Sequence, residues 1–182
     1  FHFSKTFASG VKLFAEEELS SGSILIDLGF NKISLGLFKN LALVHSITFP
    51  FGVNHIAKDL SKVCSLKLNE SQKIINNIDF SFTSFQNIFD ENGYLKNNYF
   101  IDSNFRKISK KLILDVIKAR ASEFIDKIKK QLAGVDLSKN FTSSVLLIGE
   151  GSNFLNIEKY FLNSLGINLR RSYNEINNRD DF

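Results

Sequence analysis

Apolar and polar positions alternate in three short runs near the start of the chain. Residues 24–29 and 33–38 each have the composition of a strand, and a three-residue link joins them. A third strand is expected at residues 41–49, where Pro50 and Gly52 end it because neither suits a continuing ladder. The pattern therefore predicts an antiparallel meander of three strands.

A helical spacing follows the meander. The apolar face of this first helix is predicted to consist of Val53, Ile56, Ala57, Leu60 and Val63. Asn69 is predicted to cap a second helix at residues 70–78, with Glu70 near the positive end of its dipole. Three meandering strands and then a helix are typical of the opening of a ribonuclease-H-like α/β lobe.

A long helix is predicted from Ser103 or Asn104 to Gly134, since glycine commonly ends helices. Residues 79–105, rich in Phe, Asn and Ser, are expected to form the loops and short strands of a small insert. Residues 143–161 predict a strand, a glycine turn and a helix, an arrangement common at phosphate sites. The predicted apolar face of the long helix is Ile108, Leu112, Ile113, Val116, Ile117, Phe124, Ile125, Ile128 and Leu132.

Composition fits one core or two small lobes, because 43% of the 182 residues are hydrophobic. The one cysteine, Cys64, cannot form an internal disulfide, which favours a reducing cytosol. No apolar run reaches the roughly 18 residues of a membrane span, and the first residues lack a signal-peptide core. Since the chain also lacks an initiator Met, we expect a fragment or a processed form.

Positive charge is concentrated between Arg106 and Lys130. This segment has nine Lys or Arg but only three acidic residues, Asp115, Glu123 and Asp126. Such a helix is a solvated face, a docking surface for an acidic peptide, or a phosphate-binding face. The solvated face is the commonest of the three.

Other candidate sites have ordinary explanations. The three histidines have no Cys or carboxylate at metal-ligand spacing, so we expect no zinc. Cys64 has no His at relay spacing, and Ser9 and Ser152 lack a nucleophile elbow. Interleaved Phe and Lys occur in single-strand nucleic-acid binders. Here the Phe residues fall on the apolar periods, so we interpret them as core and expect no nucleic acid.

Two glycine turns leave predicted strands about 120 residues apart, at Asp27-Leu28-Gly29 and at Gly149-Glu150-Gly151-Ser152. Either turn alone is a weak signal. Their order with "FPFGVNHIAKDL" and the basic helix resembles the second half of the actin-like ATPases, and within them the bacterial cell-division family FtsA. The resemblance implies an actin-like (ribonuclease-H-like) lobe, with a mixed sheet, flanking helices and an inserted smaller subdomain. It implies subdomain 2A at residues 1–64 and 119–182, with 2B at residues 65–118.

The resemblance also implies a nucleotide site, but this chain departs from the family there. Phe30 stands where the family's turn has glycine, Glu150 replaces the central glycine of the second turn, and the acidic and basic pair of the first 2B helix falls at Gln72 and Ile75. We therefore expect at most a weak ATPase or a pseudo-ATPase scaffold, with ATP and Mg²⁺ bound only by the full-length protein and not by this part alone. If retained, the contacts implied are Asp27 (also to Mg²⁺ through water), Gly29, Asn31, Lys32, Gln72, Lys73, Gly149, Gly151 and Ser152.

The function implied is that of a division-ring actin homologue on the cytoplasmic face of the inner membrane. The family polymerises, reaches the membrane through a segment absent here, and holds the tail of the tubulin-like FtsZ against 2B. The basic residues predicted to dock this tail are Arg106, Lys107, Lys110 and Lys111, with Arg106 and Lys110 four apart on one face of the long helix. A pilus-assembly actin homologue and a small-molecule kinase of the same superfold remain alternatives.

Overall fold

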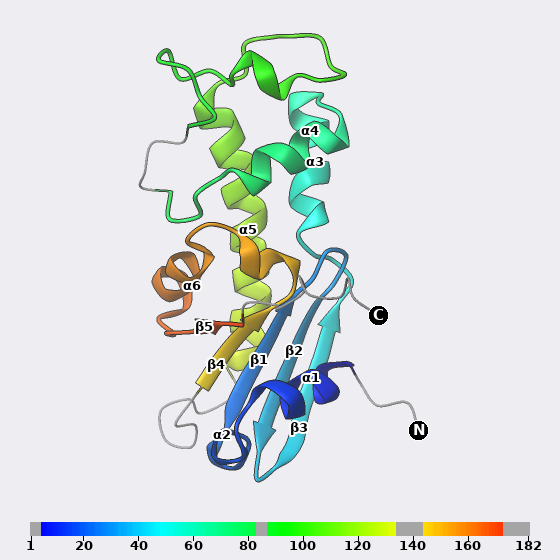
Figure 1. The fold of residues 1–182 in the computed structure, drawn as a ribbon, viewed down its shortest axis with the longest axis vertical. Coiled ribbons are helices and arrows are strands. Elements are labelled where there is room, and N and C mark those ends of the chain that lie inside the picture. The colour runs from blue at the N-terminus through cyan, green and yellow to red at the C-terminus, as the bar shows by residue number, and fades with distance from the viewer. Residues whose placement is uncertain (1–4, 83–86, 134–143, 173–182) are drawn as a thin grey trace, which may run out of the picture.

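The computed structural model describes residues 5–82, 87–133 and 144–172. A five-stranded mixed sheet occupies one end of the molecule, with strand order β3-β2-β1-β4-β5 (Figure 1). β1 pairs antiparallel with β2 and parallel with β4, so the predicted hairpin and the predicted mixed sheet are both confirmed. The strands are β1 Ser23–Leu28, β2 Ile33–Lys39, β3 Ala42–Phe49, β4 Ser144–Ile148 and β5 Arg170–Arg171.

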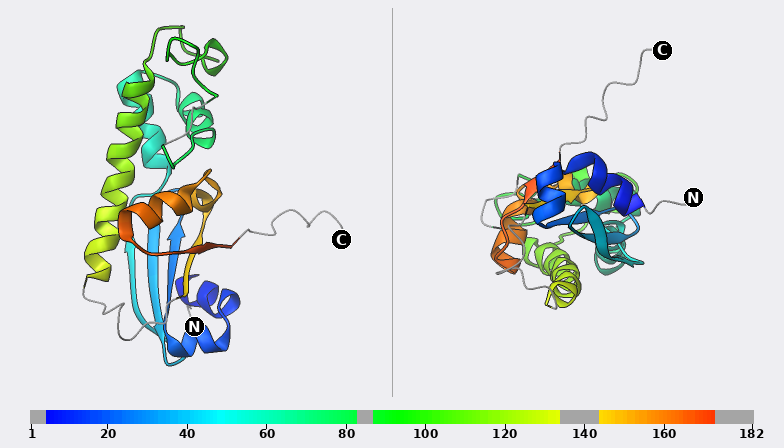
Figure 2. Two further views of the ribbon diagram at one scale, coloured as in Figure 1. Left: turned by 90° about the vertical axis from the view of Figure 1, so that its left-hand side faces the viewer. Right: turned by 90° about the horizontal axis from the view of Figure 1, so that it is seen from below.

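Helices cover both faces of the sheet. α1 and α2 lie on one face, and α5 runs along the other, past the end of the sheet into the upper part of the molecule (Figure 2). α3, α4 and the segment before α5 form that upper part (Figure 1). The helices are α1 Lys5–Leu13, α2 Glu16–Ser21, α3 Asn54–Cys64, α4 Leu68–Asn76, α5 Lys110–Leu132 and α6 Ile157–Leu165, with short 3₁₀ turns η1 Asn97–Tyr99 and η2 Glu150–Asn153.

Alternation along β1 divides the core into two layers. Ile24, Ile26 and Leu28 face the larger cluster, which also holds the apolar sides of α3, α5 and α6. Leu25 faces the smaller cluster, which includes Leu19 of α2 and Phe14, a residue between α1 and α2. Since neighbouring strand residues point to opposite faces, Asp27 is on the α1 side of the sheet.

The helix starts differ from those predicted. α4 begins at Leu68, because the Lys67 backbone N–H donates to the Glu70 carboxylate at 2.8 Å. Asn69 is therefore inside the first turn and does not cap the helix. α5 begins at Lys110, where the Ser109 hydroxyl accepts from the Leu112 N–H at 3.3 Å.

Ser103 and Asn104 thus lie seven and six residues before the start of the long helix instead of opening it. Two residues assigned to apolar faces are exposed, Val63 by 51% and Leu112 by 41%, because each helix turns that position toward solvent. Gly134, the predicted helix end, lies outside the described residues. The division at residues 64/65 and 118/119 stays a prediction. No helix in the described ranges combines the length and the apolar character needed to cross a bilayer.

Candidate functional site

The turn between β1 and β2 is closed by the Gly29 N–H, which donates to the Lys32 carbonyl at 3.1 Å. The start of α3 docks against this turn, since the N–H groups of Val53 and Asn54 donate to Gly29 and Phe30. Gly52 makes this approach feasible, because a Cβ there would lie 2.2 Å from the Gly29 carbonyl oxygen. The turn carbonyls are therefore bound to α3, and the hairpin is held firmly.

The second glycine turn packs against the end of β1. Gly149 has φ +88°, and a Cβ on it would lie 2.4 Å from Oδ1 of Asp27. A Cβ on Gly151 would lie 2.4 Å from Cδ2 of Leu28. The Ser152 hydroxyl donates to the Gly149 carbonyl at 2.6 Å, inside the turn itself. The structure thus brings Asp27, Gly149, Gly151 and Ser152 together at the carboxyl ends of two parallel strands.

Asp27 is buried and carries an ion pair that the sequence did not suggest. Nζ of Lys5 lies 2.9 Å from Oδ2 of Asp27, while Oδ1 has no hydrogen-bond partner. The two residues are 22 positions apart and lie on α1 and β1, so no local pattern indicated the contact. No group of three or more His, Cys, Asp or Glu side chains in the described part of the chain is placed to hold a metal. With an ammonium on its carboxylate, Asp27 does not fit Mg²⁺.

A pocket of about 190 Å³ opens on the other side of the β1–β2 turn, toward α3 and α4. Asn54 is 6% exposed there, and its Nδ2 donates to Oδ1 of Asn31 at 3.3 Å, while its own Oδ1 has no partner. Glu150 is the one ionisable residue in the lining. The lining residues are Phe30, Val53, Asn54, Ala57, Gln72, Ile75, Asn76, Glu150 and Phe154. Two rings, three amides and a carboxylate suit an uncharged planar group and oppose a polyphosphate.

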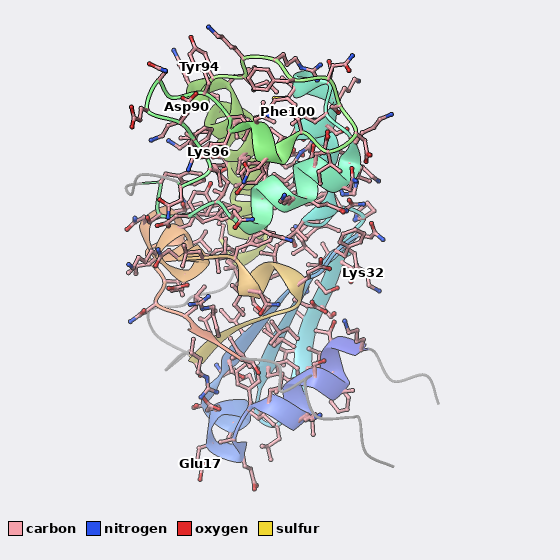
Figure 3. The ribbon with its side chains drawn as sticks, turned by 45° about the horizontal axis from the view of Figure 1, so that its top comes forward. Glu17, Lys32, Asp90, Tyr94, Lys96 and Phe100 are labelled. Carbon is pink, nitrogen blue, oxygen red and sulfur yellow. The ribbon has the colours of Figure 1, made fainter. Side chains whose placement is uncertain are left out.

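Three of the predicted nucleotide contacts are therefore grouped near this pocket, and two basic ones are not. Gln72 lines it, Asn31 bonds to one of its lining residues, and Gly29 forms the turn beside it. Lys73 instead donates to the Asn98 carbonyl at 3.0 Å, away from the turn. Lys32 is exposed on the turn, at the level where the sheet meets the upper helices (Figure 3), and is not part of the lining.

Known proteins similar to this chain share its actin-like fold. No protein-family model matches the chain. A curated relative, "Cell division protein FtsA" of Neisseria meningitidis serogroup B, is 25% identical over 151 residues, which are 81% of this chain and 35% of that protein. The chain is an FtsA-like lobe with the actin-like fold. It spans about a third of the length of that relative.

Solved structures show the same fold at low identity. A chain of the PilM–PilN type IV pilus biogenesis complex has a TM-score of 0.66 and 16% identity, with 94% of this chain and 42% of that chain covered. AMPPNP-bound MreB5 of Spiroplasma citri also gives 0.66, at 21% identity, with 91% and 52% covered. A MamK double helical filament gives 0.65, at 15% identity, with 93% and 54% covered.

In this FtsA-like lobe, the predicted partner residues divide into two groups. The Arg106 guanidinium donates to the carbonyls of Cys64, at 2.6 Å, and of Ser65, so it holds the end of α3. Arg106 precedes α5, and the expected helix face shared with Lys110 is therefore wrong. Nζ of Lys107 lies over the Tyr94 ring and Nζ of Lys110 over the Phe89 ring.

Sequence reasoning missed the exposed apolar residues beside these lysines. Ile101 is 59% exposed and Phe105 58%, and the Phe105 ring packs edge-on against Phe100 at 5.2 Å. Phe100 and Tyr94 both lie in the uppermost part of the molecule (Figure 3). We call residues 101–107 and the first turn of α5 the tip surface. Leu112, in that first turn, is a third exposed apolar side chain of this surface. The abundance of Phe throughout the chain hid the exposure of Phe105 in the sequence.

Proposed function

We propose that this chain is the partner-binding lobe of a cell-division actin homologue, which polymerises on the cytoplasmic face of the inner membrane and holds the FtsZ ring there. The match to cell division protein FtsA over 81% of the chain is the observation that carries the proposal. Self-association is supported by the fold that the chain shares with the filament-forming MamK.

The tip surface is the proposed docking site for the FtsZ tail, which in the FtsA family is acidic and partly apolar. Ile101 and Phe105 offer apolar contact, and Lys107 and Lys111 offer positive charge beside them. Exposed ion pairs contribute under ~1 kcal/mol each, so the apolar side chains would provide most of the affinity and the lysines the orientation. We expect micromolar affinity that falls as salt is raised.

Nucleotide chemistry has a minor part in this proposal. Phe30 and Glu150 line the pocket beside the phosphate turn, and a carboxylate there opposes a polyphosphate. The lobe would then serve as a scaffold in the full-length protein, with ATP binding weak and hydrolysis weaker. Any Mg²⁺ requirement would have to be met outside Asp27.

A labelled FtsZ tail peptide tests the docking site by fluorescence anisotropy. Phe105→Ser should weaken binding about tenfold, because it removes the most exposed ring of the tip surface. Lys107→Glu with Lys111→Glu should weaken it severalfold and reduce its salt dependence. The matched control is Lys127→Glu with Lys130→Glu, two exposed lysines near the other end of α5. If the control pair weakens binding as much as the tip pair, the tip surface is not the docking site.

A pilus-assembly role is the second candidate, because the PilM–PilN chain covers 94% of this chain at a TM-score of 0.66. In that case a PilN segment would be the partner in place of the FtsZ tail. The same assay with a labelled PilN peptide separates the two. Binding of the PilN peptide and not of the FtsZ tail would replace the first proposal with the second.

A further inference from the structure

The ion pair between Lys5 and Asp27 involves the aspartate that the resemblance to the actin-like ATPases assigns to Mg²⁺, bound through water. The Asp27 side chain is 8% exposed and is fixed by the end of β1, with Gly149 closely packed against its Oδ1. A carboxylate this deeply buried needs a cation or several hydrogen-bond donors. The cation that the structure places on it, at 2.9 Å, is the ammonium of Lys5.

We propose that Lys5 takes the place of a divalent cation at Asp27, so that this lobe is closed to Mg²⁺ and its phosphate turn works without metal. The Lys5 side chain is 71% exposed, so the ammonium reaches the buried carboxylate from the solvent side. A hydrated Mg²⁺ approaching Asp27 from solvent would therefore meet a positive charge first, and the two cations repel.

The surroundings offer Mg²⁺ little to outweigh this repulsion. Magnesium in proteins keeps several waters and is usually held by one or two carboxylates together with substrate phosphates. Within the described residues no cluster of three or more metal-ligating side chains exists. Glu150 lines the pocket on the other side of the β1–β2 turn. While the ammonium is paired with it, Asp27 does not make a metal site.

The ion pair with Lys5 also gives the buried Asp27 carboxylate a structural role. Without Lys5, the carboxylate would be buried with neither oxygen paired, since Oδ1 already lacks a partner. The pair joins α1 to the end of β1 across one face of the sheet. Removing the lysine should restore an anionic pocket with room for a cation.

Mn²⁺ is a direct probe, because its unpaired electrons broaden the NMR signals of nearby amides. In the wild-type chain, millimolar Mn²⁺ should leave the amide signals of Leu28 and Gly149 sharp. In Lys5→Gln the same two signals should broaden, and a second substitution, Asp27→Asn, should remove the effect. Lys12→Gln, an exposed lysine on the same helix, is the matched control and should behave as wild type.

Two results would overturn the proposal. One is broadening of Leu28 and Gly149 in the wild-type chain that Asp27→Asn abolishes, since Lys5 would then not exclude the metal. This measurement needs no Lys5 variant, so it decides the matter even if Lys5→Gln does not fold. The other is a folded Lys5→Gln chain in which Mn²⁺ broadens neither signal.

Discussion

At the scale of single residues, Glu70 joins the start of α4 to the segment that leads toward α5. Its side chain is fully buried, and Oε1 accepts from the N–H groups of Ile101, Asp102 and Ser103 at 2.6–2.9 Å. Oε2 accepts from the Lys67 N–H and from the Ser103 hydroxyl, at 2.8 and 2.5 Å. Burial alone would raise the pKa of this carboxyl, but the hydrogen bonds from Ser103, Lys67 and Asp102 outweigh it and lower the pKa to about 2.

Glu70→Gln should therefore reduce the free energy of unfolding at pH 7 by about 2 kcal/mol, the order expected for hydrogen bonds to a charged group. Because the folded-state pKa is lowered from 4.5, this stability is present above pH 4.5 and is lost as the pH falls toward about 2. Urea denaturation at several pH values should show the two proteins converging over that window. Glu91→Gln, at an exposed position in the same upper part of the molecule, should match the wild type throughout. A constant difference down to pH 2 would contradict the account of Glu70.

At the scale of secondary-structure elements, the residue at which α5 begins determines which basic residues lie on the helix and which precede it. The structure gives Ser109 as the cap, so Ser109→Ala should cost about 1 kcal/mol of unfolding free energy. Asn104, one of the two caps predicted from sequence, is exposed and lies outside the helix, so Asn104→Ala should be nearly neutral. Chemical denaturation of the two variants compares them directly. The reverse order of effects would place the helix start at the sequence-predicted position.

The elements also show what the sequence could and could not predict. The three-stranded meander was predictable because strand alternation and the breaks at Pro50 and Gly52 are local signals. The helix starts were not, because Asn69 and Ser103 have cap-forming side chains that the fold uses elsewhere. Asn69 donates to Asp102 at 3.1 Å, and Ser103 donates to Glu70. Both contacts join residues more than 30 positions apart.

Some features of the candidate site were likewise predictable from the sequence, and others were not. The two glycine turns could be recognised in the sequence, and the structure brings them together at the ends of β1 and β4. The pairing of Lys5 with Asp27 and the contact of Arg106 with the end of α3 depend on how α1 and residues 101–107 pack, which single-sequence patterns do not specify. The exposure of Phe105 was likewise decided by tertiary packing.

At the scale of the whole molecule, nucleotide binding should be absent from this lobe by itself. Calorimetric titration of the chain with Mg-ATP should give no measurable heat, because the cleft needs a second lobe and Glu150 opposes the phosphates. In the full-length protein, Phe30→Gly with Glu150→Gly should strengthen ATP binding if those two side chains obstruct it. The same double variant should bind the FtsZ tail as well as the wild type. Micromolar affinity of the unmodified lobe for Mg-ATP would refute this prediction.

At the scale of the whole molecule, the glycine turns and the tip surface also lie apart. The turns are in the middle, where the sheet meets the upper helices, and the tip surface is at the far end of those helices (Figure 1). The proposed docking site and the nucleotide site implied by the resemblance thus lie in different parts of one lobe. The central claim is that the tip surface binds the FtsZ tail.

An NMR titration of the isotope-labelled chain with unlabelled FtsZ tail peptide tests that claim most directly. The account predicts saturable shifts of the amide signals of residues 101–107 and the first turn of α5, with the signals of Leu28 and Gly149 unchanged. Shifts confined to the sheet end, or none at millimolar peptide, would contradict it.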